Sequence, residues 1–208
     1  MKRLVLSLAA LAGLVISANA QKYSVGDSYP KDGSQAEGIV FEVSADGQHG
    51  KIFSLAEGSG LKWRTVGDAD YTDDRDNGMN NFEIITAMEP EYDGYPAFAW
   101  CASLGDGWYI PAINELVKIR GAWGKSQKER KALNAKIKEL GGTPLSDAVY
   151  VKAKDAKVSA VYYSSTENGQ KRQKIYCLSF NSSSAEADGL KKMSDSAENL
   201  LFRAVKAF

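Results

Sequence analysis

The sequence predicts an α+β fold, because helical and strand-like patterns occupy different parts of the chain. Segments with helical periodicity or helix caps follow one another between residues 96 and 142, whereas segments with strand-like alternation lie before residue 56 and after residue 147. Helices gathered between strand-rich ends are typical of α+β proteins rather than of an alternating α/β order. The 208 residues are enough for one domain with a core of its own.

The first twenty residues have the three parts of a secretory signal. Lys2 and Arg3 precede an apolar segment at residues 4–16, and Ala18-Asn19-Ala20 supplies the small residues of a cleavage site. The apolar segment is shorter than the roughly 20 residues that span a bilayer, so a membrane anchor is the weaker alternative. We therefore expect a signal peptide at residues 1–20, a lead-in at 21–37 and a single domain at 38–208. The mature chain would carry no transmembrane segment and would reside in the periplasm, on the outer surface or in the medium.

Charge is balanced overall but unevenly distributed. The chain has 26 Lys and Arg residues and 26 Asp and Glu residues. A near-neutral total does not indicate a nucleic-acid or membrane partner, and none is expected. Acidic residues dominate between residues 68 and 93, and basic residues dominate between 118 and 139.

Residues 38–55, GIVFEVSADGQHGKIFSL, predict a β-hairpin. Two apolar runs with strand character flank a cluster of turn residues at 46–50. The only histidine of the chain, His49, lies in this turn, where we expect an ordinary polar loop residue. Without a second histidine, His-rich zinc sites and catalytic triads that use a His base lack their parts.

The acidic segment resembles a calcium loop at first sight, but its spacing does not fit an EF-hand. With Asp73 at position 1, Gly78 falls correctly at position 6, but Arg75 occupies position 3 and Ile84 occupies position 12, where a bidentate carboxylate is required. We expect a solvated loop with Asp and Asn side-chain turns and no resident cofactor. A calcium site of another type is the alternative.

Three helices are expected in the middle of the chain. In residues 96–104, Ala97, Trp100, Cys101 and Leu104 share one helical face. A second helix follows Pro111, after a glycine-containing break at 105–107. A third begins at the capping box SQKE, residues 126–129, and ends at the glycine pair 141–142.

The third helix has opposite apolar and basic faces. Its apolar stripe contains Leu133 and Ile137, and the lysines that fall about opposite it are Lys128, Lys131 and Lys138. This basic face is either a simple solvated surface or a patch that binds acidic glycans or another polyanion.

The last quarter of the chain returns to strands. The segments are AVYVKA (148–153), AVYYSSTE (160–167), KIYCLSF (174–180) and LLFRAVKAF (200–208). Both faces of KIYCLSF carry large apolar residues, which favours an inner strand. Cys101 and Cys177 are the only cysteines, and an even pair in an exported protein indicates a disulfide. Two buried thiols are the alternative.

Several of these segments occur in an order that resembles one known family. GIVFEV, DGQHG, NGMNNFEII, YPAFAWCASLGDGWYIPAINEL, YYSSTE and FRAVKAF, spread over residues 38–208, are similar to the Lcl C-terminal domain family of exported bacterial domains. The resemblance implies a C-type-lectin-like fold: a small twisted antiparallel sheet with two or three helices and long irregular loops. It implies a scaffold for display and binding rather than a particular chemistry.

The chain also departs from the patterns of related proteins. Many family members have Thr or Ser at the position of Ala112 and a cysteine at the position of Ala204. Because Ala204 cannot form a disulfide, the resemblance leaves Cys177 as the partner of Cys101. Sulfatase-modifying-factor enzymes have a similar aromatic and proline motif, but their catalysis depends on a close cysteine pair, and these two cysteines are far apart in sequence. The Glu-Pro-Asn and Trp-Asn-Asp motifs of calcium-dependent lectins do not occur.

We therefore expect an exported, non-catalytic binding or adhesion domain whose ligand is a glycan or a cell-surface protein. The alternatives are a structural subunit of a cell-envelope assembly, and an enzyme of unknown type related to sulfatase-modifying-factor folds. An enzyme would have to use Glu115, Glu167 or the run Ser164-Ser165-Thr166, without a usable base for the serines. No catalytic or metal-binding residue is predicted. The ligand-binding candidates are Lys128, Lys131, Lys138, Trp63 and Tyr109, although each aromatic is also a candidate for the core.

Overall fold

The structure confirms the α+β class. The computed structural model describes residues 21–208 except 33, 66–68, 152–155, 181–186 and 192–199; the predicted signal peptide, residues 1–20, lies outside the described residues. The helices are α1 (Gly78–Met88), α2 (Pro96–Ser103), α3 (Ile113–Trp123) and α4 (Gln127–Glu139). Among the described residues, no helix is of the length and apolarity that crossing a membrane requires.

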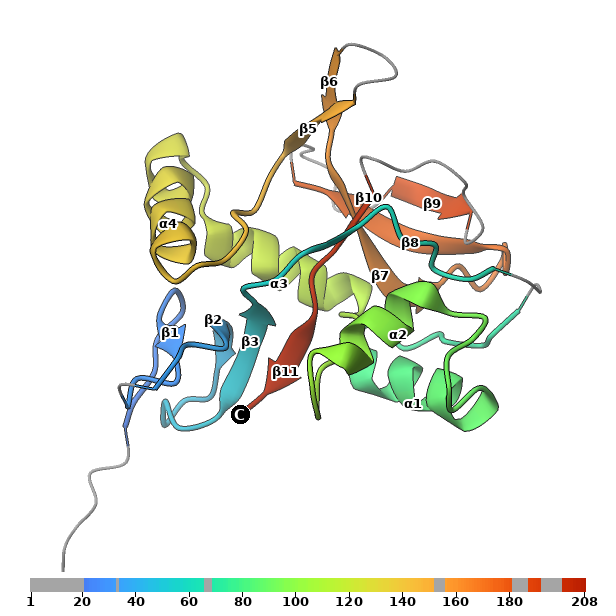
Figure 1. Ribbon diagram of the computed structural model, residues 1–208, viewed down its shortest axis with the longest axis horizontal. Coiled ribbons are helices and arrows are strands. Elements are labelled where there is room, and N and C mark those ends of the chain that lie inside the picture. Colours follow the sequence, from blue (N-terminus) through green and yellow to red (C-terminus); the bar gives the residue numbers. More distant parts are fainter. Residues whose placement is uncertain (1–20, 33, 66–68, 152–155, 181–186, 192–199) are drawn as a thin grey trace, which may run out of the picture.

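One sheet brings the first and last strands of the chain together. It contains β1 (Ser28–Tyr29), β2 (Gly38–Val43), β3 (Gly50–Ser54) and β11 (Val205–Ala207), in the order β1-β2-β3-β11 with antiparallel neighbours. The predicted hairpin is confirmed, because β2 pairs with β3 from Gly38↔Ser54 to Val43↔Gly50. Figure 1 shows β11 beside β3.

A second sheet is larger and mixed. Its strands are β4 (Gly58–Ser59), β10 (Leu200–Phe202), β7 (Val161–Glu167), β8 (Lys174–Ser179) and β9 (Ala187–Lys191), in the order β4-β10-β7-β8-β9. β10 runs parallel to β7, so this sheet is mixed, whereas the family resemblance implied a small antiparallel sheet. β8 lies between β7 and β9, which confirms it as an inner strand.

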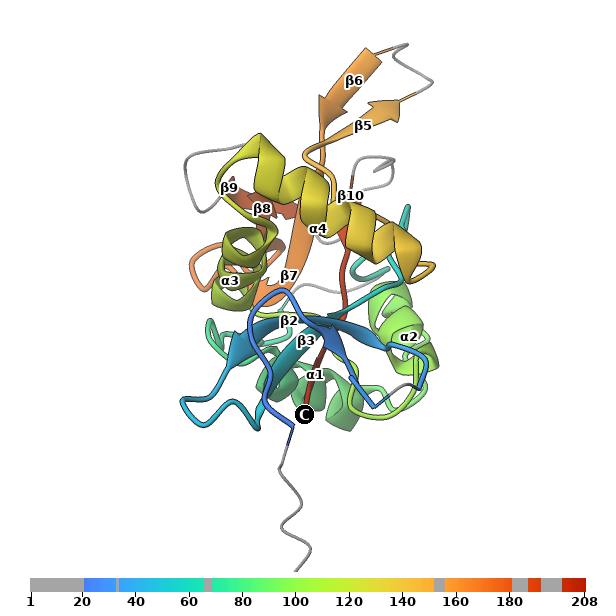
Figure 2. The same ribbon diagram turned by 90° about the vertical axis from the view of Figure 1, so that its left-hand side faces the viewer.

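A two-stranded ribbon stands apart from both sheets. It consists of β5 (Ala148–Val151) and β6 (Ala156–Ser159), which pair with each other in antiparallel register. Both Figure 1 and Figure 2 show the ribbon projecting from the body of the molecule.

The final strand segment divides between the two sheets. LLFRAVKAF was expected to form one strand, but β10 ends at Phe202 and β11 begins at Val205 in the other sheet. The interruption falls at Arg203, which is fully buried. Its guanidinium group donates hydrogen bonds to the backbone oxygens of Ser54, Leu55, Ala56 and Thr143. The chain therefore changes sheet where this side chain turns into the core.

The three predicted helices are confirmed, and α1 is an additional helix in the segment expected to be a loop. The side chain of Asn77 accepts a hydrogen bond from the backbone N of Met79 at 3.2 Å and caps the helix. The buried residues of α1 include Gly78 and Asn81 beside Phe82 and Ile85. Because a glycine and a polar residue occupy the buried face, apolar periodicity did not reveal this helix.

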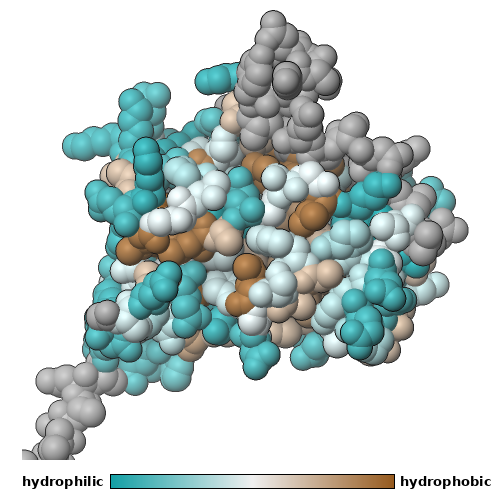
Figure 3. All heavy atoms as spheres, in the orientation of Figure 1, coloured by the Kyte–Doolittle hydropathy of each residue, from teal (hydrophilic) through white to brown (hydrophobic). Residues whose placement is uncertain are grey.

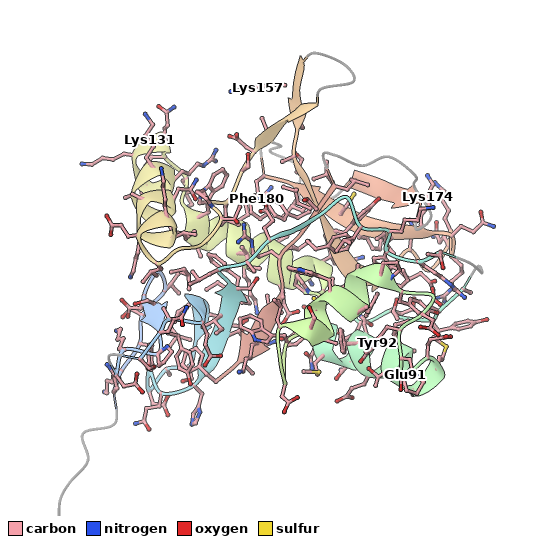
Figure 4. The ribbon with its side chains drawn as sticks, in the orientation of Figure 1. Glu91, Tyr92, Lys131, Lys157, Lys174 and Phe180 are labelled. Carbon is pink, nitrogen blue, oxygen red and sulfur yellow. The ribbon has the colours of Figure 1, made fainter. Side chains whose placement is uncertain are left out.

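The core fills the space between the helices and both sheets. Phe180, labelled in Figure 4, lies inside the molecule with its ring centroid 4.4 Å from that of Tyr162 and 5.7 Å from that of Trp123. Cys101 and Cys177 are also buried, but no disulfide joins them, so the predicted disulfide is not present. Cys101 lies on the buried face of α2, whereas Cys177 is the cross-strand partner of Tyr163 in the second sheet. Burial raises the pKa of the Cys101 thiol well above its ordinary value.

We expect the substitution Tyr163→Phe to stabilise the protein. The Tyr163 hydroxyl is buried and has no hydrogen-bond partner within the described part of the chain. An unsatisfied buried hydroxyl costs free energy that phenylalanine avoids, so the free energy of unfolding should rise by about 1 kcal/mol. Urea denaturation at pH 7 measures this difference. Tyr162→Phe is the matched control, since the Tyr162 hydroxyl is hydrogen-bonded to Glu57 at 2.9 Å and its loss should destabilise the fold.

The same position gives the fold an alkaline pH dependence. Burial, with a smaller contribution from Cys177, raises the pKa of Tyr163 above its ordinary value of 10.0. Below pH 10 the phenol is protonated in both the folded and unfolded chains, but above it the unfolded chain loses this proton first. Tyr163 should therefore lower the stability by up to about 1.4 kcal/mol per pH unit. Between pH 10 and 11, wild type should lose more stability than Tyr163→Phe, and equal losses would contradict this assignment.

Candidate binding cleft beside Tyr71

The two aromatic residues expected to contact a ligand are instead part of the core. Trp63 and Tyr109 have exposed fractions of 0% and 1%. The indole N–H of Trp63 donates to the backbone oxygen of Ser164 at 3.0 Å, and the Tyr109 hydroxyl donates to Glu115 at 2.9 Å. The prediction that they stack on a ligand is therefore wrong, because neither ring is accessible and the polar atom of each side chain is hydrogen-bonded within the protein.

The basic face of α4 lies on the surface as expected. Lys128, Lys131 and Lys138 are exposed, and Figure 4 shows Lys131 pointing away from the body of the molecule. The capping box that starts this helix is confirmed, because the backbone N of Glu129 donates to the Ser126 side chain at 3.2 Å and the Ser126 backbone N donates back at 2.8 Å. On the face drawn in Figure 3, hydrophilic residues gather over α4, and apolar residues form smaller separate areas.

The residues that an enzyme would need are engaged in holding segments together. The Ser164 hydroxyl donates to the backbone oxygen of Tyr176 at 2.7 Å, and that of Thr166 donates to the backbone oxygen of Asp74 at 2.8 Å. Thr166 also accepts from the backbone N of Ile113 at 3.1 Å, and so satisfies a donor in the first turn of α3. Both side chains are buried in β7. Thr166 joins the acidic segment to α3, and Ser164 bonds to β8.

Glu115 occupies a fully buried polar site at the start of α3. One carboxylate oxygen accepts from the Lys51 ammonium at 2.6 Å and the Tyr109 hydroxyl at 2.9 Å. The other accepts from the backbone N of Ala112 at 2.8 Å and of Gly78 at 3.0 Å. Burial and Glu115 together raise the pKa of Tyr109. The carboxylate therefore connects α1, α3 and β3 and is shielded from solvent.

The acidic segment has structural partners for several of its carboxylates. Asp70 is buried and pairs with Arg64, and it accepts a hydrogen bond from the Tyr95 hydroxyl at 2.6 Å. Asp74 accepts from the backbone N of Asp76 and Asn77, each at 2.8 Å. In the described ranges, no three His, Cys, Asp or Glu side chains are grouped so that they could hold a metal ion.

Within this segment, Tyr71 is presented outward by an unusual backbone conformation. Its φ is 59°, in the left-handed region, and its exposed fraction is 65%. The neighbours Asp70 and Thr72 have exposed fractions of 1% and 0%. The Glu167 carboxylate holds this turn, accepting from the backbone N of Asp70 at 2.9 Å and of Tyr71 at 3.0 Å.

Arg172 fixes the ring of Tyr71 from the side of β7 and β8. Its guanidinium carbon lies 4.8 Å from the ring centroid of Tyr71. The same group donates to Asp73 at 2.6 Å and to Glu167 at 2.7 Å, and these hydrogen bonds raise the pKa of Arg172. The turn, the ring and the cation are thus held as one unit.

A polar cleft of about 370 Å³ lies beside this unit. It is lined by Asp73, Arg75, Glu167, Asn168, Gly169, Gln170 and Tyr176. The Arg75 guanidinium lies 4.5 Å from the ring centroid of Tyr176, so a second aromatic residue and cation form part of the wall. Sequence reasoning missed this site. The only local signal was a tyrosine placed between acidic residues in a segment with little other apolar content.

Two further grooves flank Trp108, which lines both. The groove of about 580 Å³ lies between the end of α4, the segment after β3 and Lys206. The groove of about 450 Å³ lies between α1 and α2 and reaches the glycine-containing turn at 105–107. Trp108 itself has an exposed fraction of 7%, so it forms their shared wall rather than a free stacking surface.

No protein-family model matches the chain, and no curated protein sequence matches it. Among solved structures, a fimbrial protein from Bacteroides ovatus has a similar fold, with a TM-score of 0.60 and 18% sequence identity. The likeness covers 89% of this chain and 49% of that protein, so the chain spans about half the length of the fimbrial protein. The α+β arrangement described above is therefore one that a fimbrial protein also contains over about half of its length.

Proposed function

We propose that this chain is an exported, non-catalytic binding or adhesion domain that acts at the cell surface. The fold that it has in common with part of a fimbrial protein supports a surface role. The proposal includes the membership of the Lcl C-terminal domain family and the C-type-lectin-like scaffold that the sequence motifs favour. It also includes secretion by a signal peptide.

The distribution of polar groups carries the proposal. The side chains suited to acid, base or nucleophilic work, Glu115, Glu167 and the Ser164-Ser165-Thr166 run, have exposed fractions of at most 1%. Their hydrogen bonds are directed to other parts of the same chain. Tyr71, in contrast, has an exposed fraction of 65%, and the cleft beside it is lined mainly by polar side chains. Such an arrangement supports recognition of a ligand rather than its chemical conversion.

A structural subunit of a cell-envelope assembly is the second candidate, and the β5–β6 ribbon favours it. A two-stranded ribbon is marginally stable by itself, and each of its outer edges carries backbone groups that a strand of another molecule could pair with. The ribbon projects from the body of the molecule, where another subunit could reach it.

Surface labelling of intact cells that produce the protein tests the shared part of both candidates. We expect antibodies to label intact cells, and chemical cross-linking to distinguish the two roles. A ladder of cross-linked species supports the subunit, and a monomer that retains binding to glycans or to other cells supports the adhesion domain. Recovery of the chain only from the cytoplasmic fraction would overturn the proposal.

The basic face of α4 allows a separate test of polyanion binding. If this face binds acidic glycans, the triple substitution Lys128→Glu, Lys131→Glu and Lys138→Glu should abolish retention on a heparin column. Retention that is unchanged in the triple variant would exclude this face as the binding surface.

A further inference from the structure

We propose that Tyr71 and the adjoining polar cleft form a subsite for a neutral sugar residue of a surface glycan. This inference rests on the proposed binding function and assigns it a location and a ligand class. The residues that would contact the sugar are Tyr71, Asp73, Arg75, Gln170 and Tyr176.

The backbone at Tyr71 is the first argument. A left-handed conformation is unfavourable for a residue with a Cβ atom, and asparagine or glycine is the usual occupant. Here, a tyrosine with φ of 59° holds its ring largely in solvent, at an exposed fraction of 65%. The ring therefore contributes little to the core, and local strain around an exposed side chain is a feature of functional sites.

The rigidity of the ring is the second argument. Arg172 lies against it and is itself held by Asp73 and Glu167, at 2.6 and 2.7 Å. The two backbone donors to Glu167 fix the turn that carries the ring. A ring ordered before binding loses less conformational freedom when a ligand packs on it, which increases affinity.

The polarity of the cleft selects the ligand class. Its volume of about 370 Å³ lies at the small end of the range for small-molecule sites, which fits one or two sugar residues. The two carboxylates Asp73 and Glu167 are balanced by the two guanidinium groups of Arg75 and Arg172, so the site favours neither an anion nor a cation. Planar carboxylate, guanidinium and amide groups pair with hydroxyls, and tyrosine rings pack on the C–H faces of sugars.

A protein partner fits this surface less well. Energetically dominant contacts between proteins lie in pockets surrounded by residues that exclude water. The cleft residues Asp73, Gly169 and Gln170 are exposed and are polar or small. A polar cleft with an aromatic residue in its wall is better matched to hydroxyl groups than to an apolar protein surface.

An array of neutral glycans tests the inference. It should present terminal hexoses, 6-deoxyhexoses, pentoses and N-acetylhexosamines, together with sulfated heparin fragments for comparison. We expect the full chain to bind at least one neutral glycan. Tyr71→Gly should weaken that binding at least tenfold, whereas Tyr71→Trp should keep it within about threefold. Glycine accommodates the left-handed conformation, so the urea midpoint of Tyr71→Gly should remain close to that of wild type. Met88→Ala, at an apolar position that is 49% exposed on α1, is the matched control and should bind normally.

Several outcomes would overturn the assignment while leaving the surface function in place. These are the absence of binding to every neutral glycan, neutral-glycan binding that Tyr71→Gly does not change, and binding only to sulfated fragments that is lost in the triple lysine variant. Capture of a surface protein that depends on Tyr71 would also replace the sugar with a protein ligand. Failure of surface labelling on intact cells, in contrast, would remove the proposed function itself.

Discussion

Replacing Glu115 by glutamine should lower the free energy of unfolding by about 3–5 kcal/mol. The carboxylate is fully buried and each of its oxygens accepts two hydrogen bonds, including one from the Lys51 ammonium at 2.6 Å. A glutamine NH₂ group in either oxygen's position would face two donors, and Lys51 would lose its counter-charge. Urea denaturation followed by tryptophan fluorescence measures the loss.

Glu42→Gln is the matched control for this substitution. Glu42 pairs with Lys118 at 2.8 Å, but 36% of the glutamate side chain and 46% of the lysine side chain are exposed. Solvent screens such a pair, so its loss should cost less than about 1 kcal/mol. Equal destabilisation by the two substitutions would show that the burial of Glu115 does not have the effect assigned to it.

Replacing Arg203 by lysine should destabilise the fold by about 3–4 kcal/mol, although the charge is retained. The guanidinium donates to the backbone oxygens of Ser54, Leu55, Ala56 and Thr143 and pairs with Glu57. These five acceptors are placed around a planar guanidinium group. The three N–H donors of a lysine ammonium group cannot reach all of them. The remaining carbonyl groups would be buried without partners.

Thermal and urea unfolding of Arg203→Lys should be compared with Arg130→Lys. Arg130 lies on α4 with 29% of its side chain exposed and packs over Trp123. Its replacement should cost less than about 1 kcal/mol. A loss for Arg203→Lys as small as that for Arg130→Lys would contradict the role of Arg203 in joining the two sheets.

Local patterns predicted the elements whose signals lie in adjacent residues. The hairpin at 38–55 has alternation and turn residues, and the start of α4 has the Ser126 and Glu129 capping box. The helix after Pro111 was predicted for the same reason. In each case the physical cause is contained within a few residues, so one sequence is enough to reveal it.

Contacts between distant segments explain what the sequence did not predict. The partners of Arg203 come from residues 54–57 and 143, and no local pattern shows that they meet. In the first turn of α3, the backbone N of Ile113 donates to Thr166, which is 53 residues away in the sequence. The predicted disulfide was wrong because export and an even cysteine count say nothing about the distance between two thiols in the fold.

The candidate cleft illustrates the same limit for function. Trp63 and Tyr109 were predicted as ligand-binding residues because large aromatic residues often contact ligands. The same residues often lie in the core, and composition does not separate the two roles. In the structure, Tyr71 is distinguished from them by its backbone angle and its exposure. The turn that carries Tyr71 is held by hydrogen bonds to Glu167, which is 96 residues from Tyr71 in the sequence, so the residues next to Tyr71 do not reveal this contact.

The pairing of β3 with β11 has a consequence for the order in which the chain can fold. A chain that is synthesised from its N-terminus contains β2 and β3 early, but β3 receives its second neighbour only when residues 205–207 have been added. Until then the edge of β3 is unpaired. Contacts between residues that are far apart in sequence form slowly. Removal of residues 205–207 from the finished protein would recreate the same exposed edge of β3.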